Sequence, residues 1–324
     1  MPGGDGGRAD VVCVGETMVM LTPVTPAPLV DRPQLTMEVG GAESNVACGL
    51  AQLGHHAAWL GRVGDDPFGQ IIIRTLVAHG VDVASVEIDP RRPTGLYLKD
   101  PGAEGSTVHY YRKGSAASVT GPAHAQRVRD RAARLVHLSG ITPVLSTDCA
   151  ALVERLLTDR APGGPLLSFD VNYRPALWAP ATAAATLLPL ARAADVVLAG
   201  RDEAETLWGA ATPDDIRALL PDVPCLVVKD AEHGATCLEG DRRTFVPALN
   251  IDVLEPVGAG DAFAAGFLSA LLDGRSARDR LRLGHIAAAS ALRCVGDLAS
   301  FPPPEARTRM LAVTDEQWPA VTLD

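Results

Sequence analysis

Short apolar runs alternate along this chain with longer segments in which apolar residues recur at helical spacing. Apolar runs bounded by turn signals are typical of strands that are buried on both faces of a sheet. The runs predict strands over residues 11–15, 58–63, 135–139, 166–170, 196–198 and 226–229. The helical spacing predicts helices over residues 44–53, 67–79, 181–193, 202–208 and 259–272, with Pro180 and Asp202 near helix starts.

This order of elements predicts an α/β fold with a mostly parallel central sheet and helices on both faces. Parallel strands need crossover connections, which are usually helices, and these helices cover the faces of the sheet. Ligands of such sheets bind beyond the carboxyl ends of the strands. We therefore expect the functional residues to gather at that edge.

Two stretches interrupt the alternation. Residues 17–39 contain four prolines, and residues 94–112 contain short aromatic and β-branched segments that favour strand. They predict a small β-rich lid whose two parts are separate in sequence but able to pair in space. A lid over a cleft and an edge extension or dimerisation flap are both compatible with this pattern, and one flap can do both.

The predicted organisation follows from these breaks. The main α/β domain should comprise residues 10–16, 40–93 and 113–301, and the lid residues 17–39 and 94–112. The glycine-rich residues 1–9 are expected to form a flexible leader, and residues 302–324 a C-terminal tail that begins with a surface turn of three prolines.

The charge of the chain limits its partners. Lys and Arg total 29 against 39 for Asp and Glu, a net charge of −10, which gives no long-range attraction for nucleic acid or for an anionic membrane. No N-terminal stretch resembles a signal peptide, and no apolar run approaches the roughly 18 residues that span a bilayer. We expect a cytoplasmic protein that needs a local basic pocket to bind a small anion.

The six cysteines are scattered through apolar segments. They form no Cys-x-x-Cys pair, and no histidine stands at ligand spacing from them. This pattern favours buried reduced thiols over a zinc site or a disulfide framework.

The segment from Val257 to Phe263, which reads Val-Gly-Ala-Gly-Asp-Ala-Phe, stands at the start of an apolar helical segment. Small residues let the backbone approach a ligand, and a helix N-terminus presents unpaired N–H groups and the positive end of the helix dipole. Asp261 beside such an anion cradle suits a base that takes a proton from a hydroxyl group. The motif alone is also compatible with a tight turn whose aspartate caps an ordinary helix.

A second segment, Gly40-Gly41-Ala42-Glu43-Ser44-Asn45-Val46-Ala47, stands where a strand should pass into a helix. It resembles the N-terminal signature of the ribokinase-like (PfkB-type) sugar kinases, and the segment from Val257 to Phe267 resembles their C-terminal signature. The two signatures lie more than 200 residues apart in the right order, and the resemblance runs from about residue 11 to residue 300. It implies a ribokinase-like fold.

The resemblance also implies a reaction. Asp261 would deprotonate a primary alcohol of the sugar, which then attacks the γ-phosphate of ATP. The backbone amides of Ala259, Gly260 and Asp261 would hold the transferred group, since phosphoryl transfer depends mostly on positioning and charge stabilisation. Gly41 and Asn45 would approach the sugar hydroxyls. The chain has no Walker loop, and no Gly-x-Gly-x-x-Gly of a Rossmann dehydrogenase follows its first strand.

Within the family, three segments look most like 2-keto-3-deoxygluconate kinases: residues 110–118, residues 170–178 and the opening residues 15–19. The resemblance implies that Arg112 and Arg174 lie near the carboxylate and keto end of a sugar acid. Guanidinium groups bind carboxylates in bidentate fashion, whereas a neutral hexose has less use for both arginines. Tyr97 and Tyr110 would hold hydroxyls or the keto oxygen. Fructokinases share the Asp-x-Asn-x-Arg-Pro part of the second segment.

For the nucleotide, the resemblance implies contacts from Lys229, Gly234, Gly258 and Gly260, and it places residues 285–294 on a helix near the adenine. The same positions could also be ordinary core elements.

The metal-binding residues depart from the family pattern. An Asn-x-x-Glu motif commonly organises magnesium and its waters, and this chain keeps Glu203 but has Gly200 in place of the asparagine. Mg²⁺ is still expected, held chiefly through the phosphates of ATP, because it keeps several waters and needs few protein ligands. Glu255 stands where the family often has an aspartate near a monovalent cation, so activation by K⁺ is left open.

Two alternatives to an ATP-dependent kinase of 2-keto-3-deoxygluconate remain. One is a fructokinase or another sugar or nucleoside kinase of the same family. The other is a non-catalytic sugar-binding regulatory protein, against which the intact Gly-Ala-Gly-Asp argues, because such a protein would be free to lose Asp261. Flaps of this type often pair across a dimer, so we expect a homo-oligomer.

Overall fold

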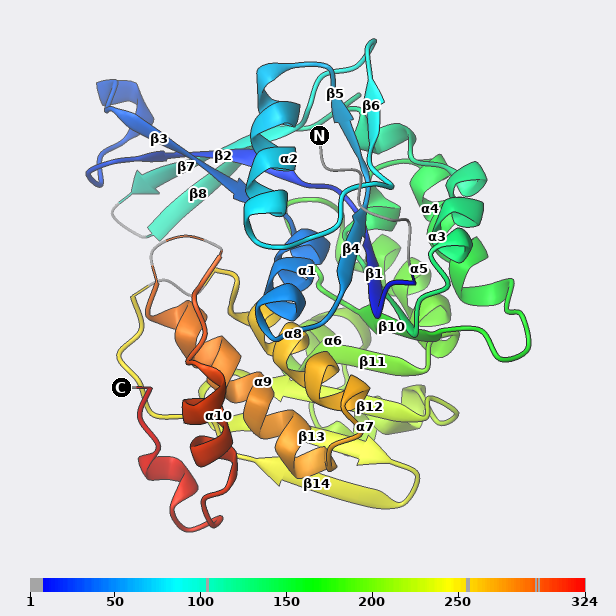
Figure 1. Ribbon diagram of the computed structural model, residues 1–324, viewed down its shortest axis with the longest axis vertical. Coiled ribbons are helices and arrows are strands. Elements are labelled where there is room, and N and C mark those ends of the chain that lie inside the picture. The colour runs from blue at the N-terminus through cyan, green and yellow to red at the C-terminus, as the bar shows by residue number, and fades with distance from the viewer. Residues whose placement is uncertain (1–7, 103–104, 255–256, 295, 297, 324) are drawn as a thin grey trace.

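The computed structural model describes residues 8–102, 105–254, 257–294, 296 and 298–323 (Figure 1). Its main body is built on a sheet of eight strands in the order β14-β13-β12-β11-β10-β9-β1-β4. In chain order these strands are β1 (Val11–Val14), β4 (Ala57–Leu60), β9 (Leu135–Ser139), β10 (Leu166–Asp170), β11 (Val196–Gly200), β12 (Cys225–Asp230), β13 (Gly234–Glu239) and β14 (Arg242–Val246).

Parallel pairing runs from β4 to β12, and the last two strands, β13 and β14, are antiparallel. The parallel strands are apolar at nearly every position because both faces of the sheet are covered. Val12 and Val14 pack into the core on one face, and Val11 and Cys13 pack into the core on the other. The α/β fold with a mostly parallel sheet, predicted from the sequence, is confirmed.

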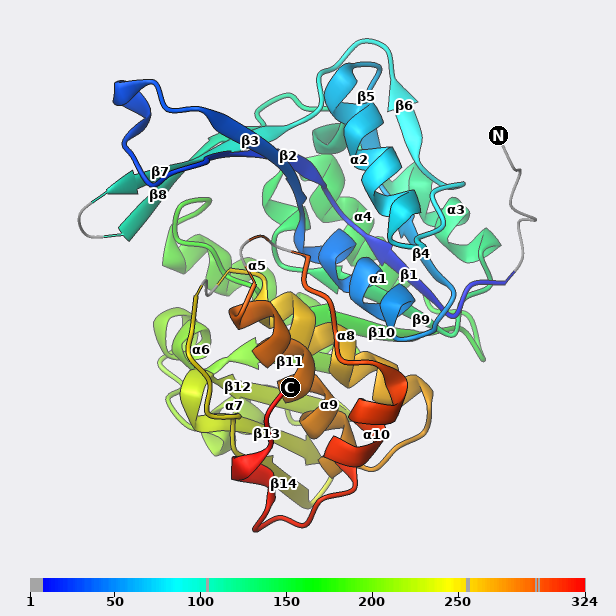
Figure 2. The same cartoon turned by 60° about the vertical axis from the view of Figure 1, so that its left-hand side comes forward.

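Helices form a layer on each face of the sheet (Figures 1 and 2). One layer consists of α1 (Ala42–Gln52), α8 (Ala259–Leu272), α9 (Ala277–Leu292) and α10 (Pro304–Leu311). The other consists of α3 (Ala125–Asp130), α4 (Thr147–Thr158), α5 (Pro180–Arg192), α6 (Arg201–Trp208) and α7 (Pro213–Leu219). Helix α2 (Pro67–Ala78) adds Ile72 and Leu76 to the apolar core between the sheet and the layer that contains α1 and α8. Short 3-10 helices lie in the connections: η1 (Leu29–Asp31), η2 (Ala117–Val119), η3 (Pro122–His124), η4 (Thr142–Val144), η5 (Ala231–His233) and η6 (Trp318–Ala320).

Local sequence explains where several helices begin. Asp66 caps α2 by accepting a hydrogen bond from the Gly69 amide at 2.8 Å, and Pro67 occupies the first helical position, where no amide hydrogen is needed. Helix α5 likewise begins with Pro180. The α2 and α5 boundaries fall within two residues of the predicted ones because these signals are local.

Helices α8 and α9 cross at very close range. A side-chain carbon added to Gly266 would lie 2.4 Å from the carbonyl oxygen of Leu283, and one added to Gly284 would lie 2.9 Å from the ring of Phe263. The two glycines therefore let the backbones approach more closely than any side chain would permit. Helix α8 is buried along almost its whole length as a result.

A second, four-stranded sheet has the order β3-β2-β7-β8 and projects from the main body (Figure 2). Its strands are β2 (Met18–Pro23), β3 (Leu35–Gly40), β7 (Leu96–Gly102) and β8 (Gly105–Tyr111). Strand β2 pairs with β7 in parallel, with Val19 opposite Leu96. The two interrupting stretches of the sequence therefore form one small sheet, which we call the lid.

Three elements differ from the prediction. The apolar run at residues 58–63 is not one strand, because the chain bends at Gly61, and β5 (Arg62–Gly64) leaves the main sheet to pair with β6 (Glu87–Asp89). The antiparallel pair β13–β14 was not predicted. Pro304, expected in a surface turn, is the first residue of α10, which packs on α9.

Cys13, Cys48, Cys149, Cys225 and Cys237 are buried thiols outside any disulfide, as the sequence predicts, whereas Cys294 is half-buried. Burial raises the pKa of the Cys48 thiol to about 12, which keeps this group protonated. Among the helices that the structure describes, none combines the length and the apolar composition needed to cross a membrane.

Candidate active site

A cavity of about 740 Å³ lies at the carboxyl ends of the parallel strands, between the main sheet and the lid. Most of the residues that the sequence singles out line it: Gly41, Asn45, Tyr97, Tyr110, Arg112, Arg174, Glu203, Lys229, Gly258, Gly260 and Asp261. They come from six separate parts of the chain. The fold brings them together because parallel strands end at the same edge of a sheet.

The strand register explains the floor of this cavity. Strand β10 ends at Asp170, which pairs with Leu198 of β11, and Gly200 at the end of β11 pairs with Lys229 of β12. The charged side chains that follow these apolar strands therefore stand side by side at one level. The Lys229 ammonium contacts both carboxylate oxygens of Asp170, at 3.0 and 2.9 Å.

The two signature segments meet directly. Asn45, in the first turns of α1, donates a hydrogen bond from Nδ2 to Oδ2 of Asp261 in the first turn of α8, at 2.8 Å. Both side chains are buried, with 7% and 8% of their surface exposed. The Oδ1 atom of Asn45 is also buried and has no hydrogen-bond partner among the residues that the structure describes. It can accept a hydrogen bond from a hydroxyl group of a ligand.

Helix α8 begins at this contact. Its N-cap, Gly258, has φ 83° and ψ −13°, a left-handed conformation that favours glycine. The first turn of the helix, whose amides have no partner within the helix, borders the cavity. A side-chain carbon added to Gly260 would meet only Lys229 Nζ, at 3.8 Å. The helix N-terminus therefore has open space in front of it and a lysine ammonium at its side, which is an arrangement suited to an anion.

The charges of the floor shift the pKa values of its buried groups. Burial by itself would lower the pKa of Lys229, but the carboxylates of Asp170 and Glu203 outweigh this effect and raise it. Burial raises the pKa of Glu203, and the ammonium of Lys229 opposes that rise. Lys229 is thus held in its charged form next to the helix N-terminus.

Both carboxylate oxygens of Glu203 accept backbone hydrogen bonds. The Gly200 amide donates to Oε2 at 2.7 Å, and the Tyr173 amide donates to Oε1 at 2.9 Å. Glu203 therefore fixes the start of α6 and the loop after β10. Its remaining lone pairs face the cavity, where they could hold the water shell of a magnesium ion.

The lid contributes tyrosines and an arginine to the other side of the cavity. The rings of Tyr97 and Tyr110 pack at 5.8 Å between centroids, and the Arg112 guanidinium lies 5.5 Å from the centre of the Tyr110 ring. Arg112 also forms an ion pair with Glu16, with Nε donating to Oε2 at 2.6 Å. The edge of the guanidinium group that carries Nε is therefore already occupied by Glu16. Ser115 donates to the other oxygen of Glu16 at 2.7 Å and fixes this carboxylate.

Arg174 differs from Arg112 in this respect. Arg174 is exposed at the cavity lining, and its side chain forms neither a hydrogen bond nor an ion pair with any other described residue. It follows Asn172, which is 5% exposed and adopts a left-handed backbone with φ 38°. Asparagine tolerates this conformation better than most residues, and the sharp turn directs the loop from the end of β10 across the cavity.

Some predicted residues lie elsewhere. Ala259 is the first residue of α8 and is not among the cavity-lining residues. Gly234 is the first residue of β13 and also lies outside the cavity; its φ of 137° and the nearby Val246 carbonyl oxygen, 2.3 Å from an added side-chain carbon, require glycine there. His285 packs against the Phe263 ring and lies 3.1 Å from the Val246 carbonyl oxygen. Glu255 and Pro256, considered for a cation site, fall outside the described residues.

Sequence reasoning did not assign several cavity-lining residues to the site, among them the polar residues Glu16, Lys99, Asp170 and Asn172. Lys99 is only 7% exposed and faces the cavity two residues after Tyr97, on the same face of β7. That alternation was a usable signal, because a charged residue on the inner face of a strand is rare without a function. Glu16 gave no such signal, since its partner Arg112 is 96 residues away.

The cavity combines an anion-binding helix N-terminus with a carboxylate that can take a proton from a hydroxyl group. This combination is what a phosphotransferase that acts on alcohols needs. Comparison with known proteins agrees. The family model of the pfkB family carbohydrate kinases matches residues 8–304, and the chain belongs to this family.

Curated relatives cover nearly the whole chain. It is 36% identical over 304 residues to a 2-dehydro-3-deoxygluconokinase of Bacillus subtilis, across 92% of this chain and 94% of the relative. It is 32% identical over 316 residues to a 2-dehydro-3-deoxygalactonokinase of Haloferax volcanii, across 92% of this chain and 95% of the relative.

Solved structures share the fold. A fructokinase of Xylella fastidiosa with bound ATP superposes with a TM-score of 0.78, covering 92% of this chain and 97% of that chain, at 22% sequence identity. At this identity the likeness shows the fold alone.

Proposed function

We propose that this carbohydrate kinase transfers the γ-phosphoryl group of ATP to the 6-hydroxyl group of 2-keto-3-deoxygluconate. The observation that carries the catalytic part is the hydrogen bond between Asn45 and Asp261, which joins the two signature segments inside one cavity. Asp261 takes the proton of the sugar hydroxyl, and Asn45 holds the Asp261 carboxylate in place.

The phosphoryl group lies in front of α8 in this proposal. The amides at the start of the helix, the open space at Gly260 and the nearby Lys229 ammonium support it. Developing negative charge is stabilised there by groups that are already oriented, which is the main contribution of a protein to phosphoryl transfer. Magnesium would be held chiefly by the nucleotide phosphates, and Glu203 would help to hold its water shell.

The sugar-acid part of the proposal rests on cations. Arg174 forms no ion pair with a described residue, although the Glu203 carboxylate is near enough to interact with it through charge, and it borders the same cavity as Arg112 and Lys99. A guanidinium group without an ion-pair partner next to a sugar-sized cavity suits a substrate carboxylate. The pairing of Arg112 with Glu16 leaves Arg174 as the principal contact and Arg112 as a second one through its remaining edge.

A fructokinase is the second candidate, because the Asp-x-Asn-x-Arg-Pro segment that carries Arg174 also occurs in that group. A sugar-binding protein without turnover is a third. The 36% sequence identity to a relative named as a kinase of a keto-deoxy sugar acid favours the first candidate over the fructokinase and over the sugar-binding protein.

The test is release of ADP by the purified protein with ATP and Mg²⁺. The panel comprises 2-keto-3-deoxygluconate, 2-keto-3-deoxygalactonate, fructose, ribose and adenosine, with Asp261→Asn as the control. We expect turnover to prefer the keto-deoxy acids and to be lost in the control. Preference for fructose would overturn the proposed substrate but keep the kinase activity, and a lack of turnover on every sugar would favour a binding protein.

Repeating the preferred reaction with K⁺ replaced by a bulky organic cation tests whether the enzyme needs a monovalent cation.

We further infer that the lid mediates a homo-oligomer. Leu35 and Met37 lie on one face of strand β3 and are 40% and 57% exposed. Alternate apolar residues exposed on a strand at a sheet edge are typical of a surface that pairs with another chain. Light scattering of the wild type and of Met37→Glu tests this inference, and a wild type that is monomeric at micromolar concentration would refute it.

A further inference from the structure

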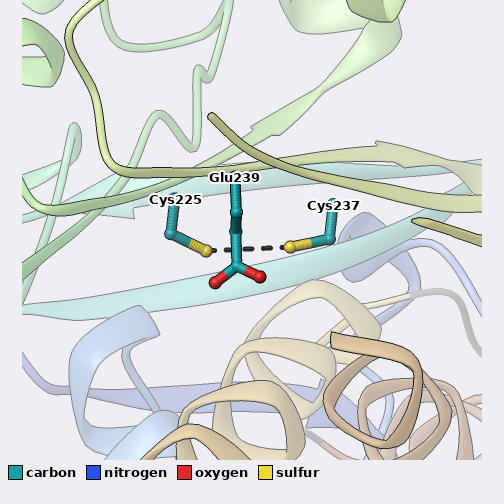
Figure 3. Close-up of side chains that lie close together, drawn as sticks. All are labelled: Cys225, Cys237 and Glu239. Atoms are coloured by element: carbon teal, nitrogen blue, oxygen red, sulfur yellow. Dashed lines mark hydrogen bonds between the residues drawn. The ribbon is translucent and has the colours of Figure 1, made fainter. Parts of the chain in front are cut away.

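Two cysteines and one glutamate lie together at the edge of the main sheet, away from the cavity (Figure 3). The Sγ atoms of Cys225 on β12 and Cys237 on β13 are 3.8 Å apart. A carboxylate oxygen of Glu239 completes the group, and all three potential ligand atoms lie within 4.8 Å of one another. Both cysteines are buried, with 5% and 1% of their surface exposed.

The antiparallel register creates this group. Strands β12 and β13 pair Leu226 with Leu238, which brings Cys225 opposite Glu239 and places Cys237 diagonally across from Cys225. Side chains alternate between the two faces of a strand, so these three residues point to the same face. The sequence spacing concealed the group, because a pair across neighbouring strands has no Cys-x-x-Cys signature.

The distance between the sulfur atoms suits a shared metal ion. Zinc bound by thiolates has Zn–S distances of about 2.3 Å, and tetrahedral angles then separate the two sulfur atoms by about 3.8 Å. A disulfide would instead require the sulfur atoms to approach to about 2.05 Å. The observed separation matches the first arrangement without movement of the strands.

The surroundings also suit a divalent ion. Two thiolates and a carboxylate carry three negative charges, and a divalent cation with the guanidinium of Arg280 on α9 balances them. Arg280 donates from Nη1 to Oε1 of Glu239 at 2.7 Å, so it can stay in place and orient the carboxylate that binds the ion. The Glu239 side chain is 23% exposed, which leaves water access on its side of the site.

We propose that Cys225, Cys237 and Glu239 bind one thiophilic divalent cation of the zinc and cadmium class, with water as the fourth ligand. Binding releases one proton from each thiol to solvent, and the two thiolates and the carboxylate then bind the ion without any change of oxidation state. Lys229 lies at the opposite, carboxyl end of β12, so this ion is structural and takes no part in phosphoryl transfer. It ties β12 to β13 next to α9.

The experiment titrates the reduced, metal-free full-length protein with Cd²⁺ and with Co²⁺ and follows the absorption band of metal-bound thiolate. We expect one ion per chain and a band intensity that corresponds to two thiolates. Cys225→Ser and Cys237→Ser should each abolish tight binding, and Glu239→Gln should weaken it by about tenfold or more. Cys149→Ser, which removes a buried thiol on α4, is the matched control and should bind as the wild type does.

Clear outcomes would overturn the proposal. One is binding well below one ion per chain, and another is binding that survives both cysteine substitutions. A third is loss of two free thiols in air with no metal band, which would make the pair a disulfide instead. If a serine variant does not fold, the two-thiolate band of the wild type and the weaker affinity of Glu239→Gln decide, and the rise in Tm with Zn²⁺ must be smaller in Glu239→Gln than in the wild type.

Discussion

Asn45 donates a hydrogen bond from Nδ2 to Oδ2 of Asp261 at 2.8 Å, although the two residues lie 216 positions apart in the chain. The contact fixes one oxygen of the proposed base. It also makes the orientation of that base depend on α1, which packs directly against α8. The two helices therefore act together in the site, and their substitutions should be coupled.

Asp261→Asn should lower kcat by about 10²–10⁴-fold, because the sugar hydroxyl loses its base. The amide is nearly isosteric, so we expect the urea unfolding midpoint to stay close to that of the wild type. Steady-state kinetics and urea denaturation on the same samples measure both effects. Activity equal to that of the wild type would rule out Asp261 as the base.

The coupling gives a sharper check. Asn45→Ala should lower kcat through misorientation of the base, but it should add little to a protein that already carries Asp261→Asn. A double-mutant cycle measures this non-additivity, which is expected for residues in contact. Fully additive effects would mean that Asn45 contacts the sugar independently of Asp261.

Arg174→Leu should raise KM for a sugar acid by about 10–100-fold, which corresponds to the loss of a charge-assisted hydrogen bond of about 1.5–3 kcal/mol. KM for fructose should change little. Arg192→Leu, an arginine on α5 outside the cavity, is the matched control. Equal effects on both sugars would remove the argument for a carboxylate contact.

Arg112→Leu is a less clean version of the same experiment. It would leave the buried carboxylate of Glu16 without its ion pair, and an unpaired buried charge destabilises a protein strongly. We expect a lower Tm as well as a higher KM, so the Glu16→Gln, Arg112→Leu double variant is needed to separate binding from stability.

Gly260→Ala should reduce kcat without loss of stability. The added methyl group would have only Lys229 Nζ within 4 Å, at 3.8 Å, so the fold tolerates it, but it would occupy the space in front of the helix. Gly258→Ala is the contrast, since its left-handed backbone should cost about 1–2 kcal/mol of stability. Wild-type turnover in Gly260→Ala would argue that the phosphoryl group lies elsewhere.

Two buried histidines should make the protein sensitive to mild acid. Burial lowers the pKa of His137 and of His285 from 6.5 to about 4. As the pH falls from 6.5 to 4, the unfolded chain takes up protons that the folded protein excludes, so stability is complete above this window and falls within it. Each histidine can contribute on the order of 3 kcal/mol at the lower end.

Urea midpoints between pH 7.5 and 4.5 measure this loss. His285→Gln, which can keep a hydrogen bond to the Val246 carbonyl oxygen, should flatten the pH dependence. His233→Gln changes a histidine whose side chain is 65% exposed and should leave the curve unchanged. An unaltered slope in His285→Gln would contradict the prediction.

Much of the fold could be predicted because its signals are local. Strands β9 and β10 match their predicted ranges, since each is a short apolar run that ends at a polar residue. The split at Gly61 was harder to predict, because the carbonyl oxygen of Gly15, which would lie 2.7 Å from a side-chain carbon added to Gly61, comes near only in the folded chain. The β13–β14 pair was missed although its signal is local, since Gly240 and Asp241 form the two-residue turn of a hairpin in which Glu239 pairs with Arg242.

The candidate site shows the same division. Asn45 and Asp261 were identified because each lies in a signature segment, whereas Glu16 and Lys99 were not assigned. Glu16 is hidden by its sequence distance from Arg112, whereas Lys99 could have been found from its alternation with Tyr97 along β7. Gly234 is the first residue of β13 and does not line the cavity, and its contact with the nucleotide stays a prediction.

The close crossing at Gly266 bears on attempts to engineer this enzyme for other sugars. Position 266 should be left out of any library, because any side chain there would collide with the carbonyl oxygen of Leu283. Lys99 and Val108 lie opposite each other on the lid and border the cavity without belonging to either large core. A focused library at these two positions could therefore alter selectivity while sparing the packed interior.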